Sequence, residues 1–255
     1  MGTVLAIVSQ KGGVGKSTTA INLASALAMR GRKTLLVDVD PQGAVRHGLG
    51  LPASPNPAGL SDVLAGTREL QDVVLATALP WLRVLLAGSV TELSEHDSYQ
   101  AQVATSPKLG ELFDRARSRG YVVVVDTPPG LGAVSRRVLS HSQHVIVPLQ
   151  CEPLALQTTT QILRSVREAV AGNPELSLDG ILLTMLEEGN AVSQRVAAYV
   201  REQLPPELLF DVAIPRTIAS IDAFAAGQPV VMRAPDDAAA VAYTKLAERL
   251  DPILK

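Results

Sequence analysis

The stretch from Ser9 to Thr18, SQKGGVGKST, combines glycines, lysines and hydroxyls in a spacing that suits phosphate binding. It nearly matches the phosphate-binding loop G-x-x-x-x-G-K-[ST], except that Gln10 stands where the template has its first glycine. Glycines let the backbone turn its N–H groups inward without a clash at Cβ, and a following helix N-terminus adds partial positive charge. In this pattern Lys16 is expected to reach the β- and γ-phosphates of a nucleotide, and the Ser17 hydroxyl to ligate Mg²⁺.

The same loop contains a second lysine, Lys11, five residues before Lys16, although one lysine is enough to hold a phosphate chain. The hydrophobic run before the loop and the helical pattern after it are the context in which phosphate loops occur. The residues predicted to bind nucleotide here are Gly12, Gly13, Val14, Gly15, Lys16, Ser17 and Thr18.

Carboxylates follow two other hydrophobic runs. The run VVVVDTPPG places Asp126 at the end of a strand, where an aspartate usually holds the Mg²⁺ shell directly or through water. The run LLVDVDPQG supplies Asp38 and Asp40, whose i, i+2 spacing puts both side chains on one side if the strand continues. One of these carboxylates near a γ-phosphate could orient a water for in-line attack; the alternative interpretation of the pair is a solvated strand end.

These side chains need strands that end at one edge of a sheet, and the hydrophobic pattern predicts such strands. Short β-branched runs alternate with helical patterns, which favours a doubly wound, mostly parallel α/β sheet with helices on both faces. No linker or composition break divides the chain, so residues 1–255 are interpreted as a single domain. The predicted strands are residues 3–9, 34–40, 82–88, 121–126, 144–149, 180–185 and 208–215. The predicted helices lie near residues 16–30, 59–66, 109–119, 154–171, 190–204 and 236–250.

The composition is that of a globular protein and excludes several classes. Hydrophobic residues make up 47% and charged residues 19% of the chain, and the net charge of −2 gives no global reason to expect a polyanion partner. Cys151 is the only cysteine, so one chain cannot build a disulfide framework or a thiolate metal cage, which fits a reducing cytoplasm. No apolar run approaches the roughly 20 residues that span a bilayer. A cytoplasmic location is therefore expected.

Together, these motifs resemble those of the ParA/MinD family, the deviant Walker-A ATPases that position DNA and other cellular cargo. KGGVGKST resembles the family's phosphate loop, LLVDVDPQG its first switch, and VVVVDTPPGLG its Walker B motif and second switch. The segments VIVPLQCEPLAL and IPR (214–216) are similar to later family segments, so the resemblance runs nearly end to end. The chain is most similar to the short, Soj-like chromosome- and plasmid-partition ATPases, which lack an N-terminal DNA-binding domain.

The resemblance implies a Mg²⁺-dependent ATPase that acts as an ATP-dependent homodimeric switch, with a ParB-like or other partner that activates it. It assigns Lys11 to the phosphates held by the partner chain in a nucleotide-sandwich dimer, where its charge acts like an arginine finger. With Lys16 as the second catalytic cation, Asp40 is expected to position the attacking water. Ser17 and Asp126 are expected to organise Mg²⁺.

Three later residues are also implied to lie at the nucleotide. Glu152 resembles a family residue that touches the partner's nucleotide. Met185 and Pro215 resemble the wall beside the adenine.

Non-specific DNA binding is a further expectation, which this sequence supports weakly. Partition ATPases often carry DNA-gripping arginines where this chain has Gly189 and Ala219. Residues 181–255 contain seven Lys and Arg against ten Asp and Glu, and phosphate contacts supply nearly all non-specific DNA affinity. Association with the nucleoid therefore depends on a local basic patch. The candidates for that patch are Arg164, Arg167, Arg195 and Arg233.

The alternative function is a MinD-like membrane-surface ATPase, or another cargo-positioning ATPase that does not bind DNA. Membrane binding needs a basic amphipathic C-terminal helix, whereas the tail AYTKLAERLDPILK has three bases and two acids. An iron–sulfur electron carrier would need two cluster cysteines from each chain, and this chain has one. The tail is not rich in tyrosine, as that of a tyrosine kinase usually is, and no N-K-x-D motif indicates a GTPase.

Overall fold

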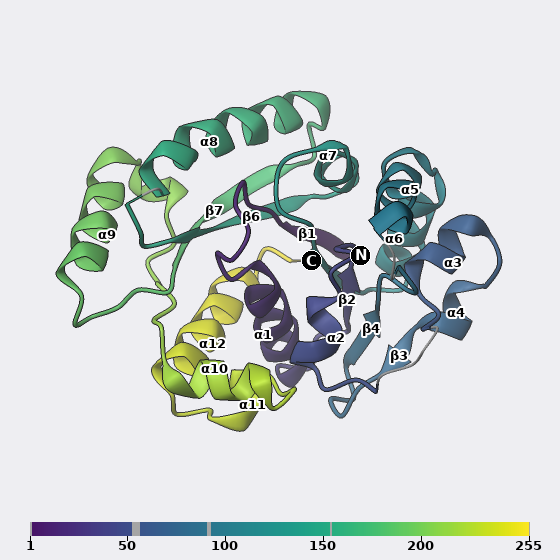
Figure 1. The fold of residues 1–255 in the computed structure, drawn as a ribbon, viewed down its shortest axis with the longest axis horizontal. Coiled ribbons are helices and arrows are strands. Elements are labelled where there is room, and N and C mark those ends of the chain that lie inside the picture. Colours follow the sequence, from purple (N-terminus) through teal and green to yellow (C-terminus); the bar gives the residue numbers. More distant parts are fainter. Residues whose placement is uncertain (1, 53–56, 91–92, 154, 255) are drawn as a thin grey trace.

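The computed structural model describes residues 2–52, 57–90, 93–153 and 155–254. Its core is a seven-stranded sheet in the order β3-β4-β2-β5-β1-β6-β7 (Figure 1). Neighbouring strands are parallel except for β3 and β4, which are antiparallel. The strands are β1 (Thr3–Ile7), β2 (Thr34–Asp38), β3 (Leu75–Ala76), β4 (Leu82–Leu85), β5 (Val122–Asp126), β6 (His144–Gln150) and β7 (Ser177–Thr184). The predicted α/β class is confirmed.

Helices cover both faces of this sheet, as Figure 1 shows. One layer consists of α3 (Leu60–Ala65), α4 (Leu70–Val73), α5 (Leu93–Thr105), α6 (Lys108–Ser118), α7 (Ala133–Leu139), α8 (Ala155–Gly172) and α9 (Ala191–Gln203). The other consists of α1 (Lys16–Met29), α2 (Ala44–Gly48), α10 (Ile218–Ala225), α11 (Val230–Arg233) and α12 (Ala238–Leu250).

The central strand β5 illustrates why the strands read as unbroken hydrophobic runs. Val123 and Val125 belong to the core beneath the α5–α9 layer, whereas Val122 and Val124 belong to the core beneath α1 and α12. Successive side chains of a strand point to opposite faces, so a strand covered on both faces needs apolar residues at every position.

The carboxyl ends of β1, β2 and β5 meet at one edge of the sheet, where the functional motifs follow them. Ile7 and Asp126 are register partners of β1 and β5, and Asp38 is the partner of Asp126 in β2. The chain leaves β1 towards β2 on one side, and β6 lies on the other, so the crevice of a doubly wound sheet is expected at this point.

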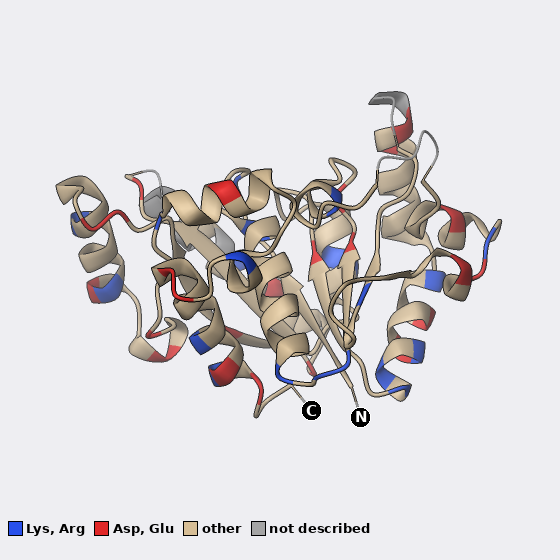
Figure 2. Ribbon diagram, turned by 90° about the horizontal axis from the view of Figure 1, so that it is seen from below, with Lys and Arg blue, Asp and Glu red and all other residues tan. Residues whose placement is uncertain are grey.

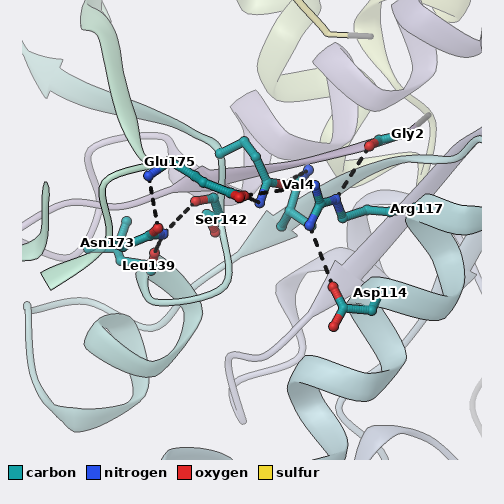
Figure 3. A network of polar contacts seen from close by, with 9 residues as sticks. Gly2, Val4, Asp114, Arg117, Leu139, Ser142, Asn173 and Glu175 are labelled. Carbon is teal, nitrogen blue, oxygen red and sulfur yellow. Dashed lines mark hydrogen bonds and ion pairs between the residues drawn. The ribbon is translucent and has the colours of Figure 1, made fainter.

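A network of polar contacts ties the elements together around the beginning of β1 (Figure 3). The amide of Val4 donates to Gln143 Oε1 at 3.0 Å, and Asn173 Nδ2 donates to the carbonyls of Leu139 and Ser142 at 2.9 and 2.8 Å. Arg117, from α6, joins this network through the Gly2 carbonyl and Asp114. The edge of the sheet away from the motifs is therefore held by fixed polar partners.

The predicted strand at residues 208–215 is wrong. The segment starts as a 3₁₀ turn (Pro206–Leu208) and then runs beside β7, making only isolated bridges at Leu209 and Pro215. The amides of Phe210 and Ile214 donate to β7 carbonyls, but prolines at its ends interrupt the pairing because they have no N–H to donate.

Several short helices were not predicted. Segment 44–80 contains the predicted helix as α3, and also α2, α4 and the strand β3. Helices α5, α7, α10 and α11 lie in stretches that the sequence interpretation left without secondary structure. The longer periodic helices begin and end within a few residues of their predicted bounds, apart from the start of α8, which adjoins a residue outside the described ranges.

Candidate functional site

The loop after β1 forms a concave backbone surface open to an anion. Gly13 and Gly15 have φ angles of 77° and 85°, a left-handed conformation that side chains other than glycine rarely adopt. Within the described part of the chain, the N–H groups of Gly12, Gly13, Val14 and Gly15 donate to no other group. Because α1 begins at Lys16, its first amides point to the same place, as in a phosphate-binding nest.

Hydrogen bonds from neighbouring strands fix the shape of this loop. The Thr184 hydroxyl, at the end of β7, donates to the Val14 carbonyl at 2.9 Å. The Ser9 hydroxyl donates to the Lys11 carbonyl at 2.7 Å, and the amide of Gly130 donates to the Ser9 carbonyl at 2.9 Å. The loop is therefore braced from both sides and does not need a ligand to set its path.

Lys16 lies buried among acids at the carboxyl edge of the sheet. Its exposed fraction is 6%, and those of Asp38, Asp40 and Asp126 are 0%, 7% and 0%. Burial lowers the pKa of Lys16, and the charges of Asp126 and Asp40 oppose that effect. Burial raises the pKa of Asp126 to about 7, against the opposing influence of the Ser17 hydroxyl and Lys16.

Asp38 and Asp40 differ in their surroundings. Burial, and then repulsion from Asp126, raise the pKa of Asp38 well above its usual range. Burial also raises the pKa of Asp40, although the Gln42 amide and Lys16 oppose the rise. The strand ends at Asp38, and the Asp40 amide donates to Asp38 Oδ1 at 3.0 Å. The expected continuation of the strand is therefore wrong: Asp38 caps the turn, and Asp40 lies in the loop.

A divalent cation fits beside Asp126 in charge and chemistry. Both oxygens of this buried carboxylate lack a hydrogen-bond partner within the described residues, and Ser17 stands in the first turn of α1 facing the same group. Mg²⁺ is commonly held by one or two carboxylates together with substrate phosphates. No cluster of three or more His, Cys, Asp or Glu suited to a metal occurs among the described residues, so an all-protein cage is not the design here.

A separate pocket of about 250 Å³ adjoins the phosphate loop at Gly15 and Thr18. Met185 and Pro215, which the resemblance assigns to the wall beside the adenine, line this pocket together with Gly15. Met185 adopts a φ of 52°, the only positive value among the described non-glycine residues, and its methyl group lies 3.6 Å from where a Cβ on Gly15 would be. Sequence reasoning missed the other walls, which come from Thr184, Ile221, Phe224 and Tyr243.

Lys11 does not point at its own phosphate loop. Its ammonium group forms an ion pair with the carboxylate of Glu152, which follows β6 in the same chain. Both side chains are partly exposed, at 44% and 28%. The structure thus brings together two residues that the sequence analysis had assigned separately, 141 positions apart.

Another hollow, of about 420 Å³, adjoins the carboxylate of Asp40. Its walls are the turn after Asp40, the TPPG loop after β5 and one side of α5. Of the three buried carboxylates at the sheet edge, Asp40 is the one that lines this hollow.

The four arginines proposed as a basic patch are divided between the layers. Arg164 and Arg167 are on α8 and Arg195 is on α9, whereas Arg233 is on α11 across the sheet (Figure 1). Arg164 is also paired with Glu168 at 3.2 Å. These four side chains therefore do not form one continuous surface on a single chain. Among the described residues, the helices are all too short or too polar to cross a membrane.

The fold and the loop define a nucleotide-binding α/β protein of the phosphate-loop class. A family model described as an AAA domain matches residues 2–178. The chain is 39% identical over 252 residues to the chromosome partitioning protein ParA of Caulobacter vibrioides, covering 97% of this chain and 93% of the relative. It is 32% identical over 260 residues to the sporulation initiation inhibitor protein Soj of Bacillus subtilis, covering 98% of each.

A solved structure of similar shape is that of cobyrinic acid a,c-diamide synthase from Mycobacterium smegmatis, with a bound ATP analog and magnesium. It has a TM-score of 0.79 and 30% identity, covering 98% of this chain and 94% of that one. The chain belongs to the ParA/MinD family of ATPases and, within it, is a Soj-like protein.

Proposed function

We propose that this protein is a molecular switch that binds ATP with Mg²⁺, dimerises and hydrolyses the nucleotide to drive partition or positioning of DNA or other cargo. The observation that carries the proposal is the set of free loop amides beside Lys16 and the unpartnered Asp126 carboxylate. Family membership supports ATP hydrolysis as the activity.

The groups at the sheet edge suit phosphoryl transfer to water. Lys16 and the loop amides bind the phosphates, while Ser17 and Asp126 would hold Mg²⁺, which neutralises charge on the β- and γ-phosphate oxygens when bound. Asp40 is the carboxylate that lines the hollow beside the TPPG loop, so it orients the attacking water. Met185 and Pro215 pack against the adenine.

We assign Lys11 to the phosphates held by the second chain of the dimer. In the single chain, the carboxylate of Glu152 holds the Lys11 side chain in an ion pair. A buried phosphate on a second chain attracts an ammonium more strongly than a partly exposed carboxylate does, because water weakens the latter attraction. Dimerisation with ATP would therefore transfer Lys11 from Glu152 to the phosphates of the partner chain. Hydrolysis then depends on dimerisation.

The test is a mixing experiment with two inactive variants. Lys11→Ala should bind ATP as a monomer, because Lys16 and the loop amides remain, but should neither dimerise nor hydrolyse ATP. Lys16→Gln should bind ATP about 100-fold more weakly, so it stays nearly free of nucleotide at an ATP concentration that saturates the Lys11→Ala chain. A mixture with excess Lys16→Gln supplies an intact Lys11 to ATP held by the Lys11→Ala chain, so partial recovery of hydrolysis is expected.

Two results would contradict this assignment. One is a Lys11→Ala chain that sediments as a dimer with ATP as the wild type does. The other is a mixture that hydrolyses no more ATP than its components alone. Glu152→Gln serves as the matched variant at the other end of the ion pair, and it should leave ATP binding by the monomer unchanged.

A ParB-like or other partner is proposed to stimulate hydrolysis. The hollow beside Asp40 is the surface that such a partner could reach without displacing the nucleotide. Positioning of a cargo without DNA binding is the second candidate, favoured by Gly189 and Ala219 and by the excess of acids over bases in residues 181–255. Retention of duplex DNA by the ATP-bound dimer, compared with the ATP-free chain, separates the two.

A further inference from the structure

A basic groove runs along α6, away from the phosphate loop. It consists of two adjoining hollows of about 460 and 400 Å³, which share Glu69, Leu70 and Arg115. One hollow reaches Leu35 and Tyr121, which stand at the beginnings of β2 and β5. Figure 2 shows basic and acidic residues distributed over the helices and loops around the sheet, with both chain termini at its lower edge.

The charge of this groove is opposite to that of the whole chain. Its basic residues are Arg68, Arg83, Lys108, Arg115 and Arg119. Only two acids, Glu69 and Glu111, line it, whereas the chain as a whole has a net charge of −2. A concave surface with one sign of charge concentrates ligands of the other sign.

Four of these five basic side chains are not used to hold the fold together, whereas Arg83 donates to the carbonyls of Pro80 and Leu82 at 3.1 Å. Among the described residues, the side chains of Arg68, Lys108, Arg115 and Arg119 have no hydrogen bond or ion pair. Arg117, which lies between Arg115 and Arg119 on the same helix, does have fixed partners (Figure 3). Arg117 therefore has a structural role, whereas Arg115 and Arg119 are free to bind a ligand.

The surface of the groove is mainly polar, and its floor contains an apolar part. Leu35 and Ala116 are buried beneath it, with Leu70 and Val74 at its side. The outer wall includes Ala76 of β3, an edge strand with both of its residues exposed. An edge strand offers unpaired backbone groups to an extended peptide.

We infer that the α6 groove binds an extended acidic segment of a partner protein that also carries apolar side chains. Carboxylates of the segment pair with the free basic side chains, and its apolar side chains occupy the floor. The eleven residues of α6 span about 16 Å, which matches about five residues of extended peptide. A nucleic acid would use the charges but not the apolar floor, so it is the less complete match.

The groove is separate from the nucleotide site, so this inference does not depend on the proposed function. Tyr121 and Asp126 stand at opposite ends of β5, one in each region. We expect the partner segment to bind with or without ATP.

The test uses a fluorescein-labelled peptide, GEELDELEG, in anisotropy titrations against the full chain. The double variant Arg115→Glu/Arg119→Glu should bind it about tenfold more weakly, since two attractions become two repulsions. The matched control, Arg167→Glu/Arg195→Glu, changes two exposed arginines outside the groove and should bind as the wild type does. Retained ATP binding by both double variants verifies their folding.

Two further peptides separate the contributions that charge and apolar contacts with the floor of the groove make to binding. GQQLNQLQG lacks the charges and GEEGDEGEG lacks the leucines, and both should bind more weakly than GEELDELEG. The inference is overturned if the two double variants bind GEELDELEG equally, or if removing the leucines changes nothing. It is also overturned if a duplex DNA binds the groove, with loss in Arg115→Glu/Arg119→Glu, more tightly than the peptide does.

Discussion

Replacing Asp126 by asparagine should change how the stability of the nucleotide-free protein depends on pH. The carboxyl group has a pKa of about 7 in the fold because of burial, against 3.8 for an ordinary aspartate. Between those two values the folded chain holds a proton that the unfolded chain has released. The free energy of unfolding therefore falls as pH rises from about 4 to about 7, and stays low above that range.

The size of this fall follows from the difference between the two pKa values. At about 1.4 kcal/mol for each pH unit, it amounts to about 4 kcal/mol. The Asp126→Asn substitution removes this fall in the free energy of unfolding. The amide has no partner in this position, which costs about 1–3 kcal/mol, but this penalty is the same at every pH and leaves the slope unaffected.

The assay is urea unfolding at several pH values between 5 and 8, with EDTA and without nucleotide. Asp236→Asn is the control, because this exposed aspartate has no contact that would couple its charge to folding. The free energy of unfolding of Asp126→Asn should change less with pH than those of the wild type and the control. Curves for Asp126→Asn and the wild type that run parallel within about 1 kcal/mol would refute the reasoning.

Two other substitutions test the division of roles at the sheet edge. Lys16→Gln should weaken ATP binding by about 100-fold, because the variant loses a charged hydrogen bond to phosphate. Isothermal titration calorimetry measures this affinity, and a variant that binds ATP as tightly as the wild type contradicts the assignment of the loop. Asp40→Ala should retain Mg²⁺-dependent ATP binding and dimerise, but hydrolyse ATP about 10²–10⁴-fold more slowly in a phosphate-release assay. Loss of Mg²⁺-dependent binding in that variant instead makes Asp40 a metal ligand.

The parts of the site that could be predicted from sequence are those whose geometry is local. The phosphate loop, α1 and the strand end at Asp126 follow from short motifs, because the turn and the helix are determined by neighbouring residues. The Lys11–Glu152 pair could not be foreseen, since it depends on how the loop after β6 packs against the loop after β1. The place of Tyr243 in the pocket beside Met185 and Pro215 likewise depends on the docking of α12 on α1.

The prediction of secondary structure failed where the hydrophobic pattern was short, or where it suited more than one kind of element. Residues 208–215 are apolar enough for a strand, but they contact β7 only at isolated points. Helix α5 is polar over much of its length, so its periodicity is weak, although Tyr99 and Val103 are buried in the core. Tertiary contacts, and not local preference, decide such segments.

Because β5 is buried along its whole length, the two regions at its ends can change independently in evolution. Five residues of strand separate the groove at Tyr121 from the carboxylate of Asp126 by about 17 Å. All five are buried and tolerate little change, whereas the arginines on the outer turns of α6 are exposed. Surface substitutions on α6 can therefore change which segment the proposed groove binds, while the buried strand still holds Asp126 in place at its other end.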